Sequence, residues 1–271
     1  AIEVKKEEKR LTKIPSKSLV KREEFRFKKP NLKIIPLGGI EEIGKNITVF
    51  EYGDDIIVVD CGIEFPTDDM LGIDMVIPDV TYLIKNKEKI KGLVITHGHE
   101  DHIGSIPYIL KQVDMPIYAT KLTLELIKNK LDEHNLLRTT KLHEVKQGQT
   151  VKLGKFAIEF ISSCHSIPDA VMLAIHSPVG TVLHTGDFKI DYTPIDGKKM
   201  DLGRIAELGN KGILALMSDS TNAERKGFTM SESSVGEVID KLFINCKKRI
   251  VVATFASNVH RVQQIVDSAV K

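Results

Sequence analysis

Residues 96–102 constrain this chain more than any other segment, because they place three histidines and an aspartate within six positions. The run follows directly on residues 92–95, which are apolar and read as a buried strand. A strand that ends in a loop can aim several side chains at one point. A loop rich in histidine by chance is the alternative, and the preceding strand argues against it.

The spacing within this loop predicts how its side chains divide between ions. His97 and His99 can share one ion, while Asp101 and His102 point toward a neighbouring one. Imidazole and carboxylate together suit Zn²⁺ or Mn²⁺. Two adjacent ions clamp both oxygens of an in-line displacement, which is the chemistry of phosphodiester or ester hydrolysis.

Two later segments offer further ligands. His165 lies just past a predicted strand at 156–162, and Asp187 lies just past another at 181–185. Loops at one edge of a sheet converge, so we expect both to join the first cluster, with Asp187 bridging the two ions. One ion then has His97, His99, His165 and Asp187, and the other has Asp101, His102 and Asp187. The second ion is short of a protein ligand, which water or a residue beyond the C-terminus would supply.

Two more polar residues lie on the strands that lead to this site. Asp60 ends a buried strand, where it could orient a ligand histidine by accepting its second N–H or could cap the following turn. We favour the first interpretation. His184 lies inside a strand, and we expect it to be buried or to support a ligand. The remaining histidines without a partner pattern are expected on the surface or in packing, and they are His134, His143 and His176.

Composition limits the class of protein. A chain of 271 residues with 42% hydrophobic residues can hold one large domain, or one domain and part of another. No apolar run reaches the ~18 residues of a membrane span. The three cysteines lack CxxC spacing and read as reduced thiols, so we expect a cytoplasmic protein without a membrane contact.

Charge is unevenly distributed along the chain. Residues 1–30 carry eleven Lys or Arg and five Glu, whereas the whole chain has a net charge of only +2. This segment has few apolar residues and no sustained period, so it predicts a flexible basic arm. The arm could hold a nucleic-acid backbone or could serve only as a solubilising tail.

After Pro30 the pattern predicts sheets covered by helical layers, an α/β fold. The chain starts at Ala1 and stops inside an apolar-periodic helix, so we expect a fragment or a processed chain. The predicted strands are 32–37, 47–52, 56–60, 92–96, 116–119, 142–145, 150–153, 156–162, 170–177, 181–185, 212–217 and 249–255, and the predicted helices are 82–90, 103–112, 122–134, 231–245 and 259–270.

Asp60, the HxHxDH run at 97–102, His165 and Asp187, in that order, resemble the metallo-β-lactamase superfamily. That superfamily has a four-layer αββα sandwich with its metal site at one sheet edge. Five longer segments look like the bacterial ribonuclease J family, and they are 36–46, 96–104, 184–189, 218–224 and 255–261. The resemblance runs from about Leu32 to the end of the chain.

The resemblance implies a β-CASP nuclease, in which a second α/β domain is inserted into the lactamase-like one. We therefore expect a basic arm at 1–30, a metallo-β-lactamase-like domain at 31–230 and the beginning of a truncated β-CASP domain at 231–271. The family binds its second metal partly through a histidine of a later segment, which matches the ligand gap noted above and puts the activity of the chain alone in question. It also makes Ser220 and His260 candidates for phosphate or nucleotide contacts, with a turn-forming hydroxyl and a polar helix start as the alternatives.

The implied activity is metal-dependent hydrolysis of RNA, by 5′→3′ exonuclease and endonuclease action, in mRNA decay and rRNA maturation. A hydroxide between two divalent ions, zinc by preference and manganese as the alternative, would attack the phosphorus, with Asp101 and Asp187 as the catalytic carboxylates. The implied partners are single-stranded RNA with a 5′-monophosphate, further copies in a homodimer or homotetramer, and RNA-decay proteins. A small-molecule hydrolase of thioesters or lactams and a non-catalytic subunit are the rival readings.

Overall fold

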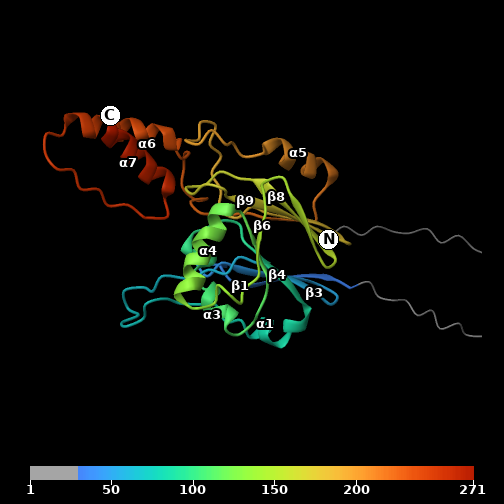
Figure 1. Cartoon of the computed structure of the whole chain (residues 1–271). Helices are drawn as coiled ribbons and strands as arrows, with labels where there is room; N and C mark the ends of the chain where they lie inside the picture. Colours follow the sequence, from blue (N-terminus) through green and yellow to red (C-terminus); the bar gives the residue numbers. More distant parts are fainter. Residues whose placement is uncertain (1–29) are drawn as a thin grey trace, which may run out of the picture. The chain divides into compact units, whose positions relative to one another are not determined.

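Two β-sheets and the helices that cover them make up the chain from residue 30 onward, the part that the computed structural model describes (Figure 1). The predicted arm at 1–30 lies almost wholly outside the described residues, so it stays a prediction. Among residues 30–271, no helix is long and apolar enough to cross a membrane.

The first sheet has six strands in sequence order. Strands β1 to β3 are antiparallel, and β3 to β6 run parallel to one another. The strands are β1 Leu32–Gly38, β2 Ile47–Tyr52, β3 Asp55–Val59, β4 Ile90–Val94, β5 Ile117–Ala119 and β6 Leu142–Glu144.

The second sheet has five strands in the order β11-β10-β9-β8-β7. Neighbouring strands within this sheet pair antiparallel, except β10 and β11, which pair parallel. The strands are β7 Thr150–Leu153, β8 Phe156–Ser162, β9 Val171–Ser177, β10 Gly180–His184 and β11 Ala215–Met217.

Alternate residues of the central strands fill two different cores, which is why these strands are mostly apolar on both faces. In β3, Ile57 and Val59 face the second sheet and pack in one cluster with residues such as Phe160 of β8. Ile56 and Val58 face the opposite way, toward helices. Each sheet is therefore buried on both faces.

Helices complete the outer layers. On the first sheet these are α1 Thr81–Lys85, α2 Glu100–Ile103, α3 Ile106–Leu110 and α4 Lys121–Glu133, whose buried side chains join the cluster of Ile56 and Val58. On the second sheet α5, Leu202–Lys211, packs Leu208 against Met172 and Leu183 (Figure 1). The layers are helix, sheet, sheet and helix, so the predicted αββα sandwich is confirmed.

Two predicted helices differ from the structure, and one helix was not predicted. The helix predicted at 82–90 is the short α1, followed by a 3₁₀ turn, η1 Lys87–Lys89, and by the start of β4. The helix predicted at 103–112 is the shorter α3, which has Pro107 in its first turn. Ile103 belongs to the separate helix α2. α5 was not predicted, although Asp201 caps its N-terminus and Gly212, with a φ of 84°, follows its last turn.

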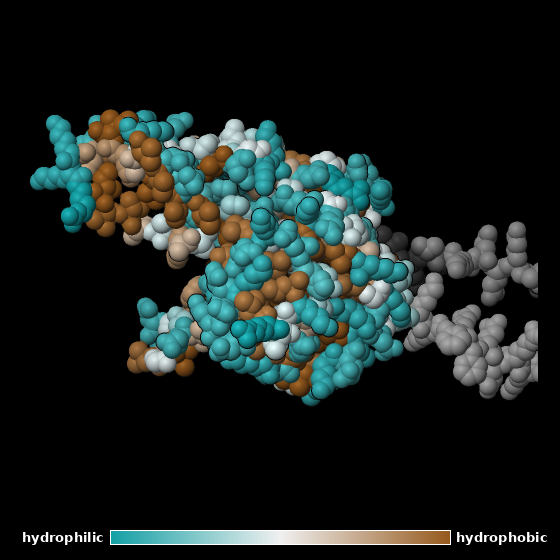
Figure 2. Space-filling model, viewed as in Figure 1, coloured by the Kyte–Doolittle hydropathy of each residue, from teal (hydrophilic) through white to brown (hydrophobic). Residues whose placement is uncertain are grey.

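The strand predicted at 249–255 is wrong. Within the described residues this segment has no regular secondary structure and no strand partner, and a strand without a partner leaves its backbone groups unpaired. Val251 and Phe255 are 87% and 83% exposed. Figure 2 shows brown, apolar residues gathered over this end of the chain, near α6 and α7 of Figure 1.

The last segment is a pair of helices, α6 Glu232–Asn245 and α7 Val259–Val270. Arg261 of α7 forms an ion pair with Glu232 of α6, and Ser268 donates to Asp240. Ser231 caps α6 and also donates to Asp191 of the preceding part of the chain. The predicted domain boundaries at 31–230 and 231–271 stay predictions.

Candidate metal centre

Three segments that follow strands bring the predicted ligands to one edge of the sandwich. His97 and His99 follow β4, and the short helix α2 carries Asp101 and His102. From the other sheet, His165 follows β8 and Asp187 follows β10. The two sheets face each other here, so side chains that are 90 residues apart in sequence meet at one point.

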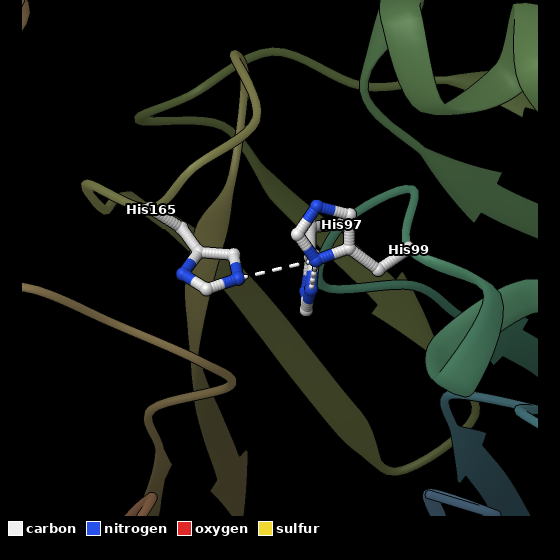
Figure 3. A group of neighbouring side chains, drawn as sticks. All are labelled: His97, His99 and His165. Atoms are coloured by element: carbon white, nitrogen blue, oxygen red, sulfur yellow. Dashed lines mark hydrogen bonds between the residues drawn. The ribbon is translucent and has the colours of Figure 1, made fainter. Parts of the chain in front are cut away.

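Three histidines form the first donor set (Figure 3). Nδ1 of His99 lies 3.2 Å from Nε2 of His97 and 3.2 Å from Nε2 of His165. Oδ2 of Asp187 completes the set, at 4.0 Å from His97 Nε2 and 3.7 Å from His165 Nε2. The three imidazole nitrogens lie close enough together to hold one ion, and an oxygen of Asp187 would be its fourth donor.

A second donor set lies beside the first. Nε2 of His102 is 3.3 Å from Oδ1 of Asp187 and 3.5 Å from Oδ2 of Asp101. Asp187 therefore turns one carboxylate oxygen toward each set. The rings of His97 and His102 are 4.0 Å apart between centroids, so the two sets are adjacent. His97 also lies close to both His102 and Asp187, so it adjoins both sets, and the predicted division of ligands between two ions stays a prediction.

Burial keeps the first set able to donate lone pairs. It lowers the pKa of His99, lowers that of His97 well below its usual value, and lowers that of His165 to about 4. At neutral pH these rings are neutral, the form that binds a metal. Burial of Asp187 acts to raise its pKa, but the hydrogen bond and charge of His102 prevail and hold it at about 2. Burial raises the pKa of Asp101.

His102 is held by Asp60. Nδ1 of His102 lies 2.8 Å from Oδ2 of Asp60, and a carboxylate can only accept, so Nδ1 carries the proton. Nε2 then faces Asp101 and Asp187, and the second proton that it carries would leave when an ion binds there. Thr96 also donates to Asp60 through its backbone N–H and its hydroxyl, each at 2.8 Å. Burial acts to lower the pKa of His102, but Asp60 and Asp187 raise it well above its usual value.

His184 lies outside both donor sets. Its Nδ1 accepts a hydrogen bond from the N–H of Gly186, in the turn that leads to Asp187, and burial lowers its pKa. It thus supports the loop that carries a predicted ligand.

A cavity of about 590 Å³ adjoins the cluster, with His165, Asp187 and His260 in its wall. Asp219 and Thr221 also line this cavity, whereas Ser220 between them is exposed and is not among its described lining residues. His260 therefore lies in the wall of this cavity, whereas Ser220 lies between two lining residues without being one itself.

Asn46 is a residue of the site that the ligand pattern did not identify. Its Nδ2 lies 3.0 Å from the carbonyl oxygen of Asp101, 3.4 Å from Asp101 Oδ2 and 3.2 Å from His102 Nε2. The Gly38-Gly39 pair shortly before Asn46 could have drawn attention to this segment, because glycines often allow the backbone to approach a site closely.

Comparison with known proteins agrees with this geometry. Residues 41–220 match the Metallo-beta-lactamase superfamily. The chain is 56% identical over 242 residues to "Ribonuclease J" of Synechocystis sp., which covers 89% of this chain and 38% of that protein. It is 45% identical over 248 residues to "Ribonuclease J" of Thermus thermophilus, covering 89% and 43%. It is also 45% identical over 244 residues to "Ribonuclease J" of Helicobacter pylori strain J99, covering 90% and 35%.

The chain spans less than half the length of each of these curated relatives. Among solved structures, a protein of unknown function from Enterococcus faecalis V583 superposes with a TM-score of 0.66 at 18% identity, covering 87% of this chain and 63% of that one, and it supports the fold alone. The matched superfamily and the histidine and aspartate cluster together indicate a site for divalent metal.

Proposed function

The chain belongs to the metallo-beta-lactamase superfamily, and from this premise we propose that it is a metal-dependent ribonuclease that hydrolyses RNA phosphodiester bonds. Its similarity to three proteins named ribonuclease J supports RNA as the substrate. The observation that carries the proposal is the position of Asp187, one oxygen of which faces His165 while the other faces His102.

Two divalent ions fit these donors. One would be held by His97, His99, His165 and Asp187, and the other by Asp101, His102 and Asp187. Zinc is our proposal for both, since histidine-rich sets with carboxylates suit it, and manganese is the alternative. Bound ions would polarise the phosphate and lower the pKa of a water molecule.

The protein's own groups have defined tasks in such a reaction. Asp60 keeps the proton of His102 on Nδ1, so that Nε2 faces inward. Asp187 supplies a carboxylate oxygen to each donor set, and Asp101 is our candidate to accept the proton of the attacking water. The cavity beside His165 would take the nucleotide next to the scissile bond, with His260 in its wall as a candidate phosphate contact. We keep Ser220 as a weaker candidate of the same kind.

The remaining parts of the proposal rest on resemblance. They comprise 5′→3′ exonuclease and endonuclease action on 5′-monophosphorylated single strands, roles in mRNA decay and rRNA maturation, assembly as a homodimer or homotetramer, and RNA-decay partners. A cytoplasmic location and the beginning of a β-CASP domain at 231–271 likewise stay predictions.

The test measures metal content and RNA cleavage together. Wild type, His99→Ala and Asp187→Ala are prepared in the same way, analysed for bound zinc and manganese, and assayed on 5′-monophosphorylated RNA. We expect His99→Ala to lose one ion and Asp187→Ala to weaken both. His143→Ala is the matched control, because this exposed histidine stacks on Tyr118 away from the cluster.

Undiminished metal in both site variants would refute the assigned ligands. A wild type that binds two ions yet cleaves a thioester and leaves RNA intact would instead favour a small-molecule hydrolase. Two bound ions with neither activity would point to a non-catalytic role for this chain.

A further inference from the structure

We propose that Asn46 is a positioning residue for the second ion, because its side-chain amide holds Asp101 in the orientation that a ligand needs. This inference rests on the proposed two-ion site and adds to it a residue from outside the histidine loop. Asn46 lies directly before β2, more than 50 residues ahead of Asp101.

Hydrogen bonds define how the amide is oriented. Nδ2 of Asn46 is 3.0 Å from the carbonyl oxygen of Asp101 and 3.4 Å from its Oδ2. Both partners can only accept when the carboxyl is ionised, so the NH₂ end of the amide must face them. The backbone N–H of Asn46 also donates to the Asp101 carbonyl, at 3.1 Å. One residue thus contacts both the main chain and the carboxylate of Asp101.

The chain around Asn46 is built to bring it this close. A side chain on Gly39 would place its Cβ 2.7 Å from Oδ1 of Asn46. A Cβ on Gly62 would lie 1.5 Å from the Asp101 carbonyl oxygen, which no native contact tolerates. Gly62 in turn donates its N–H to the carbonyl of Asn46 at 3.0 Å. Two glycines and one asparagine therefore pack around the first turn of α2.

Asp101 needs this support more than the histidines do. Of the two carboxylates in this proposed set, Asp187 is shared with the first ion, whereas Asp101 serves the second ion alone. One N–H of the amide faces the Asp101 carboxylate and the other faces the Asp101 main-chain carbonyl, so together they restrict the rotation of this side chain. The amide also lies 3.2 Å from Nε2 of His102, the other donor of this set.

The experiment measures metal binding directly, without an assay of activity. Zn²⁺ and Mn²⁺ are titrated into the metal-free wild type and into Asn46→Ala and Asn46→Asp, and heat and bound metal are recorded. We expect the first ion to bind as in the wild type and the second to bind about 10- to 100-fold more weakly in both variants. Asn86→Ala is the matched control, since Asn86 Nδ2 donates to the Tyr82 carbonyl at 2.9 Å, away from the site.

Asn46→Asp separates positioning from direct ligation. The aspartate keeps the shape of the side chain but loses both N–H groups and puts a negative charge next to Asp101. If Asn46 were itself a ligand through its oxygen, Asn46→Asp would hold the second ion as tightly as the wild type or more tightly, and that result would overturn the proposal.

Two further outcomes have different meanings. Unchanged binding of both ions by Asn46→Ala would also refute the role of Asn46. A wild type that binds only one ion would contradict the two-ion function instead. Thermal unfolding in the presence of chelator shows whether each metal-free variant is folded, so that a lost fold is not taken for a lost ligand.

Discussion

Oδ2 of Asp60 lies 2.8 Å from Nδ1 of His102, and both side chains are almost completely buried. Asp60 has a φ of 60°, a left-handed conformation that is uncommon for residues other than glycine. Its backbone N–H donates to the Val94 carbonyl, and its carboxylate accepts from Thr96. A strained residue held by this many bonds at a site is what a positioning role requires.

Replacing Asp60 by asparagine should weaken the binding of the second ion. The amide can present an N–H to His102, which would move the histidine proton to Nε2 and remove the lone pair from the donor set. We expect the affinity for that ion to fall by about 10- to 100-fold, as for other partners of metal-binding histidines. Competition against a coloured chelator measures this, and equal affinity for both ions in Asp60→Asn and wild type would contradict it.

Gly62→Ala should disturb both the fold and the metal site. The new Cβ would overlap the carbonyl of Asp101, so α2 must shift, at a cost of about 1–3 kcal/mol in the free energy of unfolding. Chemical denaturation measures the stability, and metal analysis should show loss of the second ion before the first.

The control for this substitution is Gly209→Ala, in α5. A Cβ there meets no atom within 4 Å, and alanine favours a helix by about 1 kcal/mol over glycine. Gly209→Ala should therefore be slightly stabilising and leave metal binding unchanged. A similar loss of stability in both variants would show that the close contact at Gly62 is unimportant.

The ion pair between Glu159 and Arg204, on the outer face of the second sheet, should make the free energy of unfolding depend on pH. Arg204 donates to it through Nε at 2.7 Å and Nη2 at 3.0 Å, and these bonds lower the pKa of Glu159 below its usual 4.5. A carboxyl whose pKa is lower in the folded state stabilises the fold above about pH 4.5 and loses that contribution as the pH falls through the folded value. Glu159→Gln should thus lose about 2 kcal/mol at neutral pH.

Denaturation curves of wild type and Glu159→Gln between pH 3 and pH 7 test this. The difference should be greatest near neutral pH and shrink below about pH 4.5. Glu207→Gln is the matched control, because Glu207 also accepts from Arg204 but is 64% exposed, so its effect should stay below about 1 kcal/mol. A constant difference at every pH would exclude the ion pair as its cause.

Metal removal should destabilise the folded protein, since the donor sets come together only on folding. A ligand whose free concentration is 100 times its dissociation constant raises the free energy of unfolding by about 2.7 kcal/mol per site. Chelator should lower the unfolding midpoint of wild type and have a smaller effect on His165→Ala, which lacks a donor of the first set. Equal midpoints with and without chelator in the wild type would argue against bound metal.

Local pattern was enough to predict most of the sandwich. β2, β3 and β8 are mostly apolar because both of their faces are buried, and such short apolar runs are visible in the sequence. The strand predicted at 249–255 shows the limit of this reasoning. The same apolar run is present there, but a strand exists only when another strand pairs with it, and none does among the described residues.

The sequence by itself identified the histidines and aspartates that meet at the candidate metal site, because they follow predicted strands and loops at one sheet edge converge. Their division between two ions stays a prediction. Only the tertiary structure decided that Asp187 turns one oxygen to each set, that Asp60 bonds to His102 and that Asn46 reaches Asp101. The contacts of Asp60 and Asp187 with His102 and of Asn46 with Asp101 join residues 42, 85 and 55 positions apart. No local pattern encodes the register in which two sheets and their loops meet.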